Sequence, residues 1–433
     1  MSFPRYPKYK ESGVEWLGEV PEHWQVEPLY GTVTERAESN EGMVEENLLS
    51  LSYGRIVRKD ITSNDGLLPE SFETYQIVRP GDVVFRLTDL QNDKRSLRSA
   101  LVEETGIITS AYLAVTPISA NSRFMSYLFR SYDTAKVFYS MGGGLRQSMK
   151  FADLKRMPTV LPPTTEQIQI AAFLDRETAK IDGLVAEQQR LMELLKEKRQ
   201  AVISHAVTKG LNPDAPMKPS GVEWLGEVPA HWEVTRMAAV FGEVAEQGLD
   251  ALPILSVSIH DGVSDDELAD EDVDRKVTRS DDRTKYKRVM PGDLVYNMMR
   301  AWQGGFGTVT VEGMVSPAYV VARPRGRVRT QYIEHLLRTA QAVEQMRRHS
   351  RGITDFRLRL YWDEFKNLGA LLPPLVEAEA ICREIETMDD EFAALVSASE
   401  RSIRLLMERR AALISAAVTG QIDVRHLAQE AAA

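Results

Sequence analysis

The stretch Ser12-Gly-Val-Glu-Trp-Leu-Gly-Glu-Val-Pro-Glu-His-Trp-Gln-Val26 decides how this chain is organised, because it occurs twice. It returns as Ser220-Gly-Val-Glu-Trp-Leu-Gly-Glu-Val-Pro-Ala-His-Trp-Glu-Val234, with differences at only two positions. Shorter matching pairs follow at a similar offset: 78–85 with 289–296, 110–112 with 317–319, 161–163 with 372–374, and 201–208 with 412–419. The chain of 433 residues is therefore a tandem duplication of a repeat of about 210 residues.

The first part of each repeat predicts a mixed helix and strand domain, either α/β or α+β. Pro-Gly-Asp turns at 80–82 and 291–293 precede short β-prone runs at 83–85 and 294–296. Further buried strands are predicted at 111–115 and 318–322, and helices at 124–140 and 332–348. The repeated motifs match while the segments between them differ, which favours two related domains with separate specificities.

The second part of each repeat predicts one long helix after a Leu-Pro-Pro sequence. The first begins at Thr164 or Thr165 and ends before Gly210. Forty-odd residues at about 1.5 Å each give a rod of roughly 60 Å. The two helices are expected to pair antiparallel through heptad positions. These are Ile181, Leu184, Gln188, Leu191, Leu195 and Val202 in the first helix and Ile385, Met388, Phe392, Leu395, Ser399, Ser402, Leu406 and Leu413 in the second.

The predicted organisation is two related globular domains and two long helices, arranged about a pseudo-twofold axis. The segments are 1–163 (first domain), 164–212 (first helix), 213–374 (second domain) and 375–433 (second helix and C-terminal tail). Ser399 and Ser402 weaken the second seam, and they indicate either contact with another chain or a crowded helix crossing.

Charge and composition restrict the class of protein. The net charge is −10, but residues 323–359 hold ten arginines and only three acidic side chains, so a local phosphate-binding face is compatible with an acidic chain. Cys382 is the only cysteine, which excludes disulfides within the chain and favours a reducing cytoplasm. No apolar run approaches the roughly 20 residues of a membrane helix, and no secretory signal is seen.

The repeated motifs resemble the specificity subunits of type I restriction–modification systems. The resemblance rests on the Ser-Gly-Val-Glu-Trp-Leu-Gly opening, the Leu-Pro-Pro helix entry, the Ile-Ser-x-Ala-Val-Thr helix exit, and the stretches 85–98 and 315–320. It spans nearly the whole chain. It implies that each domain recognises one half of a split DNA site, and that the two helices form an antiparallel coiled coil that spaces the domains and docks methyltransferase subunits.

Candidate DNA contacts in the first domain follow the strand at 83–85. Lysine and arginine suit phosphates, while Gln, Asn and Arg can pair with base edges. The alternative is a solvated surface loop. The candidates are Arg86, Thr88, Gln91, Asn92, Lys94, Arg95 and Arg98, with Arg146, Gln147 and Lys150 after three glycines at 142–144.

The second domain offers corresponding candidates. Asn297, Arg300, Trp302 and Gln303 follow its strand, and Trp302 is alternatively a core residue. A second, basic stretch adds Arg348, Arg351, Arg357 and Arg359, for which a solvated loop is the alternative. By contrast, His23 and His231 are retained in both repeats and are expected to pack rather than to recognise DNA.

Missing motifs predict a chain that is inert alone. It has no Asn/Asp-Pro-Pro-Tyr methyltransferase motif, no Walker motif and no spaced metal-ligand cluster. We therefore expect no catalytic, metal or cofactor site here, with S-adenosylmethionine, ATP and magnesium on partner subunits. The expected partners are double-stranded DNA, two methyltransferase subunits and restriction/translocase subunits, with no membrane. The competing functions are a fused restriction–modification enzyme, which lacks its motifs, and a coiled-coil scaffold without DNA recognition.

Overall fold

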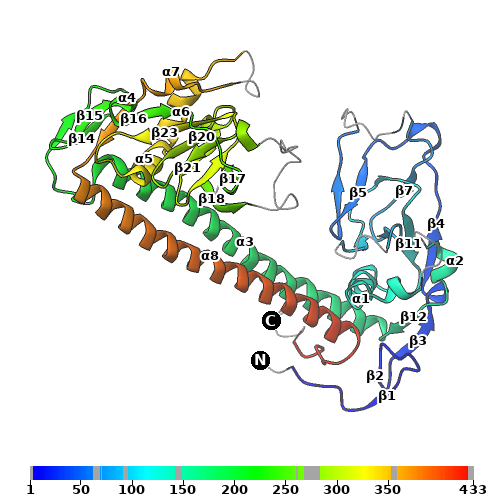
Figure 1. Cartoon of the computed structure of the whole chain (residues 1–433). Helices are drawn as coiled ribbons and strands as arrows, with labels where there is room; N and C mark the ends of the chain where they lie inside the picture. The colour runs from blue at the N-terminus through cyan, green and yellow to red at the C-terminus, as the bar shows by residue number, and fades with distance from the viewer. Residues whose placement is uncertain are drawn as a thin grey trace. The chain divides into compact units, whose positions relative to one another are not determined.

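The computed structural model describes residues 3–61, 69, 71–90, 96–141, 149–259, 262–267, 283–352 and 358–427. The chain forms two compact units: unit 1 comprises Met1–Gln189 and Glu400–Ala433, and unit 2 comprises Arg190–Ser399. Each unit contains one repeated domain together with a portion of each long helix (Figure 1). The units therefore do not coincide with the sequence repeats, because the end of the second helix packs in unit 1.

The two long helices are confirmed. They are α3 (Thr164–Lys209) and α8 (Leu375–Val418), and each carries a glutamate in its first turn. Both end at a glycine with a left-handed backbone, Gly210 (φ 79°) and Gly420 (φ 77°). A side chain at Gly420 would collide with Pro21, so the helix exit also needs glycine for close packing.

The helix seam is shifted from two of the predicted positions in α3. Leu184 and Leu191 are 48% and 42% exposed, whereas Val185 and Met192 are half-buried, so the predicted leucines are wrong. In α8, Leu395 is exposed and Val396 is half-buried, so the same correction applies. The buried positions of α3 keep the alternating spacing of four and three residues, with Val185 and Met192 in place of Leu184 and Leu191. Arg199 and Asp389 pair across the helices in unit 2, with Nε 2.7 Å from Oδ1.

The two domains have the same sheet topology. In unit 1 a four-stranded sheet has the order β4 (Val33–Arg36), β11 (Leu113–Pro117), β8 (Val83–Phe85), β9 (Ser99–Leu101). In unit 2 the order is β16 (Phe241–Val244), β23 (Tyr319–Pro324), β20 (Leu294–Asn297), β21 (Phe306–Thr308). The duplication seen in the sequence is thus a duplication of fold.

Four two-stranded sheets in each unit complete the match. In unit 1 they pair β1 (Tyr9–Glu11) with β2 (Glu19–Pro21), β3 (Gln25–Pro28) with β12 (Pro158–Leu161), β5 (Leu49–Ser52) with β6 (Arg55–Arg58), and β7 (Gln76–Val78) with β10 (Gly106–Ile108). In unit 2 they pair β13 (Met217–Pro219) with β14 (Glu227–Pro229), β15 (Glu233–Arg236) with β24 (Gly369–Leu372), β17 (Leu255–Ser258) with β18 (Gly262–Glu267), and β19 (Lys287–Val289) with β22 (Gly313–Val315). The strand pairs in the described part of the chain are antiparallel. The mixed class is confirmed, and of its two forms the antiparallel one is present.

The predicted domain helices are present but divided. In unit 1, α1 (Ser122–Thr134) ends before Lys136, whose left-handed backbone (φ 61°) leads into a 3₁₀ turn at Val137–Ser140. In unit 2, α5 (Thr330–Leu337) ends before Thr339, whose hydroxyl accepts from the Ala342 amide at 3.3 Å and starts α6 (Ala340–His349). One-turn helices α2 (Phe151–Leu154), α4 (Met237–Val240) and α7 (Trp362–Phe365) and short 3₁₀ turns at 29–31, 41–43, 283–285 and 301–303 complete the elements.

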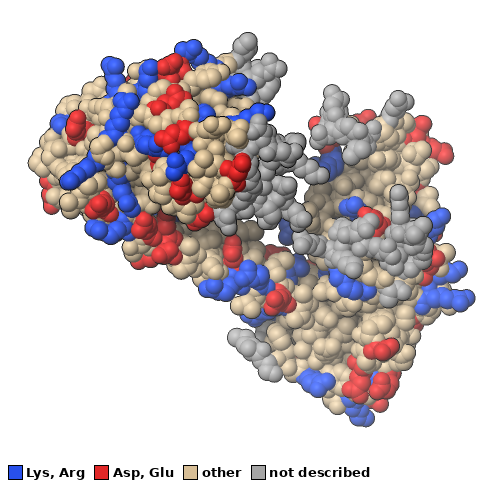
Figure 2. Space-filling view, viewed as in Figure 1, with Lys and Arg blue, Asp and Glu red and all other residues tan. Residues whose placement is uncertain are grey.

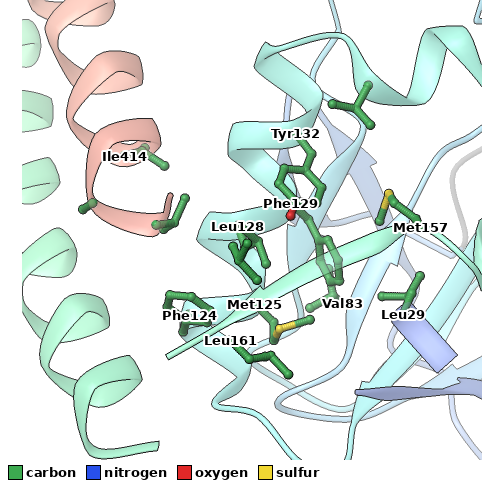
Figure 3. Close-up of a cluster of buried hydrophobic side chains, with 14 of the residues drawn as sticks. Leu29, Val83, Phe124, Met125, Leu128, Phe129, Tyr132, Met157, Leu161 and Ile414 are labelled. Atoms are coloured by element: carbon green, nitrogen blue, oxygen red, sulfur yellow. The ribbon is translucent and has the colours of Figure 1, made fainter. Parts of the chain in front are cut away.

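The core of unit 1 lies between α1, the sheet and the helices. Figure 3 shows Phe124, Leu128 and Phe129 of α1 in one cluster with Val83, to which Ile414 from the end of α8 also belongs. These five side chains are all buried. The last turns of the chain therefore belong to the core of the first domain, which explains why unit 1 includes residues beyond 400.

The repeated opening motif anchors each domain to the helix that follows it. Trp24 and Trp232 are fully buried. His23 Nε2 lies 2.8 Å from Glu166 Oε2, and His231 Nε2 lies 2.7 Å from Glu377 Oε2. These histidines bind the first turn of α3 and α8, but their side chains are 41% and 48% exposed, so the packing interpretation describes the tryptophans and not the histidines. Among the described residues, none of the helices is both long enough and apolar enough to span a bilayer.

Candidate nucleic-acid interface

In unit 2 the structure brings together the two predicted clusters. The amide of Leu360 donates to the carbonyl of Met298 at 2.8 Å, which joins the segment after β20 to the basic stretch. Arg351 and Arg359 face each other in an antiparallel bridge with two N–H···O bonds of 2.9 Å. Residues that are about 50 positions apart in sequence therefore share one edge of the domain.

This edge is hollowed and exposed. A hollow of about 820 Å³ is lined by Met299, Arg351, Gly352, Arg359, Tyr361, Asp363 and Glu364. The Arg351 side chain is 73% exposed and pairs with Glu364. Arg359 and Gln303 are exposed, while Asn297 and Arg300 are half-buried. Exposed cations beside a concave surface are suited to phosphates, and the amide of Gln303 is suited to a base edge.

Several of the predicted residues also have structural duties. The Asn297 side-chain oxygen accepts from the Met299 amide at 3.0 Å and fixes the turn after β20. Trp302 is half-buried against the core, and its indole donates to the Met299 carbonyl at 3.1 Å, so the packing alternative describes its ring. Arg348 pairs with Glu344 at 3.0 Å on the surface of α6, which lowers its net contribution to a positive field.

Unit 1 repeats the same junction. The amide of Met149 donates to the carbonyl of Leu87 at 3.0 Å, and these two residues precede Leu360 and Met298 by the same 211 positions. Half-buried Arg86 and Thr88 therefore lie near Lys150, which is exposed at the start of α2.

Arg98 is a correction to the predicted set. Its side chain is completely buried. Its guanidinium donates to the Thr88 carbonyl at 3.1 Å and to the Tyr139 hydroxyl at 3.4 Å, and its backbone amide donates to Asp133. An arginine whose donors are directed into the domain cannot reach a DNA duplex, so Arg98 stabilises the loop that follows β8.

Seven predicted residues lie outside the described part of the chain: Gln91, Asn92, Lys94, Arg95, Arg146, Gln147 and Arg357. Their roles remain predictions. Met299 and Tyr361, in turn, were not predicted, although each is about 40% exposed beside the hollow. Apolar residues next to β-strands are usually core, so only their exposure distinguishes them.

Basic and acidic side chains are interspersed on the visible face of unit 2, as Figure 2 shows. Arg323, for example, pairs with Asp293 at 3.0 Å. Such paired arginines leave only local positive sites. The described residues contain no group of three or more His, Cys, Asp or Glu arranged to hold a metal ion.

Comparisons with known proteins identify the fold. No protein-family model and no curated protein matches the sequence. The chain is similar to one in a solved structure described as "Structural basis underlying complex assembly and conformational transition of the type I R-M system", with 16% identity, a TM-score of 0.63, and coverage of 92% of this chain and 98% of that one. It is also similar to the HsdS subunit from Thermoanaerobacter tengcongensis, with 16% identity, a TM-score of 0.50, and coverage of 93% and 98%. The chain therefore has the fold of HsdS, the specificity subunit of type I restriction–modification systems.

Proposed function

We propose that this chain is the specificity subunit of a type I restriction–modification complex and recognises a split DNA site, one half with each domain. The observation that supports this most directly is the junction shared by both units. It joins the segment after β8 to the start of α2 in unit 1, and the segment after β20 to the start of α7 in unit 2. The backbone contact is the same, while the side chains differ.

The differing side chains give the two domains different chemistry. Thr88 and Lys150 in unit 1 correspond to Met299 and Tyr361 in unit 2. A hydroxyl and an ammonium group favour hydrogen bonds to bases and phosphates, whereas a thioether and a phenol ring favour apolar contact with a base, such as a thymine methyl. Two frames of equal fold with unequal side chains are what a protein needs to recognise two unlike half-sites, and a scaffold has no need of this difference.

We further propose that catalysis belongs to the partners. Two methyltransferase subunits would dock on one chain, with restriction/translocase subunits joining through them in the cytoplasm. S-adenosylmethionine, ATP and magnesium would bind to those subunits. Mass measurement of the co-expressed complex tests the stoichiometry, and a complex that stays at one methyltransferase per chain at saturation contradicts it.

The DNA-recognition proposal is tested by exchanging the differing pair. Met299→Thr with Tyr361→Lys gives unit 2 the pair of unit 1. After co-expression with the methyltransferase, methylome sequencing should show altered bases in one half-site and an unchanged partner half-site. Arg236→Ala is the matched control, because Arg236 is exposed in unit 2 but belongs to the separate sheet of β15 and β24. A wild-type complex with active methyltransferase and no split motif would refute the proposal, as would a change in both halves.

Salt dependence separates phosphate contacts from base contacts in the same hollow. Arg351→Ala and Arg359→Ala should each weaken binding to all sequences and reduce the salt slope by about one unit if the arginine neutralises a phosphate. The affinity of purified complexes for cognate and random duplexes, measured at several salt concentrations, checks this. A loss confined to the cognate duplex would assign that arginine to a base instead.

A further inference from the structure

Arg130 of α1 fastens a hairpin and a sheet edge in unit 1. Its Nη2 donates to the carbonyls of Gly54 and Ser99, both at 2.6 Å. Arg338, 208 positions later, does the same in unit 2: Nη2 donates to Phe306 at 2.8 Å and Nη1 to Ile259 at 3.4 Å. The two arginines are therefore equivalent anchors for the hairpins β5–β6 and β17–β18.

The two anchors differ in their counter-charge. In unit 2 the Arg338 Nε donates to Glu334 Oε1 at 3.2 Å, and Glu334 Oε2 accepts from the Thr308 amide at 2.7 Å. The residue equivalent to Glu334 in unit 1 is Ser126, which carries no charge. The Nε of Arg130 is buried without a hydrogen-bond partner, and Arg130 has no ion pair among the residues that the structure describes. A carboxylate that completes this site in unit 2 is thus absent from unit 1.

The surroundings of Arg130 increase the need for a negative group. Burial lowers its pKa to about 10, and the positive charges of Arg410 and Arg55 act in the same direction, against the opposing effect of Asp133. Arg410 is already bound to Asp182, with Nε 2.9 Å from Oδ1. Arg55 is exposed and has no partner within the described ranges. The carboxylates around them are already paired, Glu103 and Asp175 with Arg123, Glu104 with Arg58 and Asp182 with Arg410. Arg55 and Arg130 therefore share one region in which neither has an ion pair among the described residues.

Both of these arginines line the same cavity. It has a volume of about 840 Å³ and lies within unit 1, where α1 and the β5–β6 hairpin meet portions of α3 and α8. Ser126 is also part of its lining, so the missing carboxylate would project from this wall. Tyr127 adds a hydroxyl beside it. The cavity is of the size that proteins use for small ligands.

We propose that this cavity binds a small oxyanionic ligand, a carboxylate or a phosphate ester, whose anionic group takes the place that Glu334 fills in unit 2. A guanidinium presents paired donors that match such groups, and the volume leaves room for the body of the molecule that carries them. The bound anion would fix the hairpin to α1 and strengthen the attachment of the first domain to the helices. This site is independent of DNA recognition and does not rest on the proposed function.

The test uses hydrogen exchange of the full chain alone, titrated with inorganic phosphate or with acetate against chloride at constant ionic strength. Amides of β5–β6 (49–58) and β9 should gain protection several-fold and saturably. The equivalent amides of β17–β18 and β21 in unit 2 are the internal control and should not change. A preference between the two probes assigns the ligand class. No saturable protection by either anion, or equal protection in both units, would overturn the proposal.

Ser126→Glu provides the matched variant. It places a carboxylate four residues before Arg130, the arrangement that unit 2 already has. The hairpin should then be protected without added anion, and the response to phosphate or acetate should be lost. Ser126→Gln introduces a side chain of the size of glutamate but without its charge, and it should keep the protection by phosphate or acetate. A full anion response in Ser126→Glu would show that the anions act elsewhere.

Discussion

Arg98 is a single residue on which the fold of the first domain depends. Its charged group is buried and is satisfied by the Thr88 carbonyl and the Tyr139 hydroxyl. Arg98→Met leaves those acceptors without a donor, so we expect the free energy of unfolding of unit 1 to fall by about 2–3 kcal/mol. Lys150→Met is the control, since that side chain is exposed. Thermal and urea unfolding measure both, and equal small effects would contradict the structural role.

For single residues, the sequence predicts which tryptophans are buried, but it does not predict where an arginine side chain points or which apolar side chains are exposed. The repeated Trp24 and Trp232 are buried, as their retention in both repeats predicts. Arg98, however, has the same sequence pattern as the other candidate cations, because composition around a cation does not reveal which way the guanidinium points. Met299 and Tyr361 were missed for the converse reason, since apolar side chains give no sequence signal of exposure.

The C-terminal tail is an element that closes unit 1. Val424 is fully buried, the Asp423 amide donates to the Pro4 carbonyl at 2.8 Å, and Arg176 donates to the Leu427 carbonyl at 3.3 Å. In unit 2 the chain runs directly from the end of α3 into the second domain. In unit 1 the end of α8 is instead attached to the first domain by the packing of the tail. Deleting 421–433 should cost unit 1 about 2–4 kcal/mol through lost apolar burial. Deleting only 428–433 should not. Exchange of the β1 and β2 amides measures this, and an unchanged protection in the longer deletion would refute it.

The helix seam gives a second prediction at the scale of elements. Val185 packs against the core of unit 1, while its neighbour Leu184 is largely exposed. We expect Val185→Gln to lower the free energy of unfolding by about 1–2 kcal/mol and Leu184→Gln to change it by less than about 0.5 kcal/mol. Urea unfolding of the two variants compares adjacent positions on one helix. A larger loss of stability in Leu184→Gln than in Val185→Gln would instead support the helix seam predicted from the sequence.

The seam also shows what limits prediction of an element. Spacing of three and four residues fits both Leu184 and Val185, because they lie three and four residues after Ile181 and a helical turn takes about 3.6 residues. The sequence therefore predicts that α3 and α8 are long and one-sided, and it predicts where they begin and end. The partner surface decides which neighbour is buried, and this is not encoded locally.

The molecule as a whole follows the duplication that the opening motif predicts. Equal strand orders in the two four-stranded sheets confirm it. The antiparallel pairing did not follow from short apolar runs, which suit either kind of sheet. Nor did the boundaries of the compact units, since these depend on Ile414 and Val424 from the end of the chain packing against the first domain. Contacts between distant parts of a sequence leave no local pattern.

The last prediction concerns the helices as a ruler for the split site. A helix lengthens by about 1.5 Å per residue, so four extra residues add roughly 6 Å, or one to two base pairs of duplex. An insertion near Lys209 would displace Gly210 from its packing against Trp232 and Pro229. We therefore place the insertion between the units, after Gln189 in α3 and after Ser399 in α8, where it leaves each unit intact. With the methyltransferase co-expressed, the methylome should show a spacer longer by one or two base pairs and unchanged half-sites. Insertion in α3 alone is the control and should impair pairing of the helices. An unchanged spacer in the paired insertion, or new bases in either half-site, would mean that the helices pack the molecule together without setting the distance between half-sites.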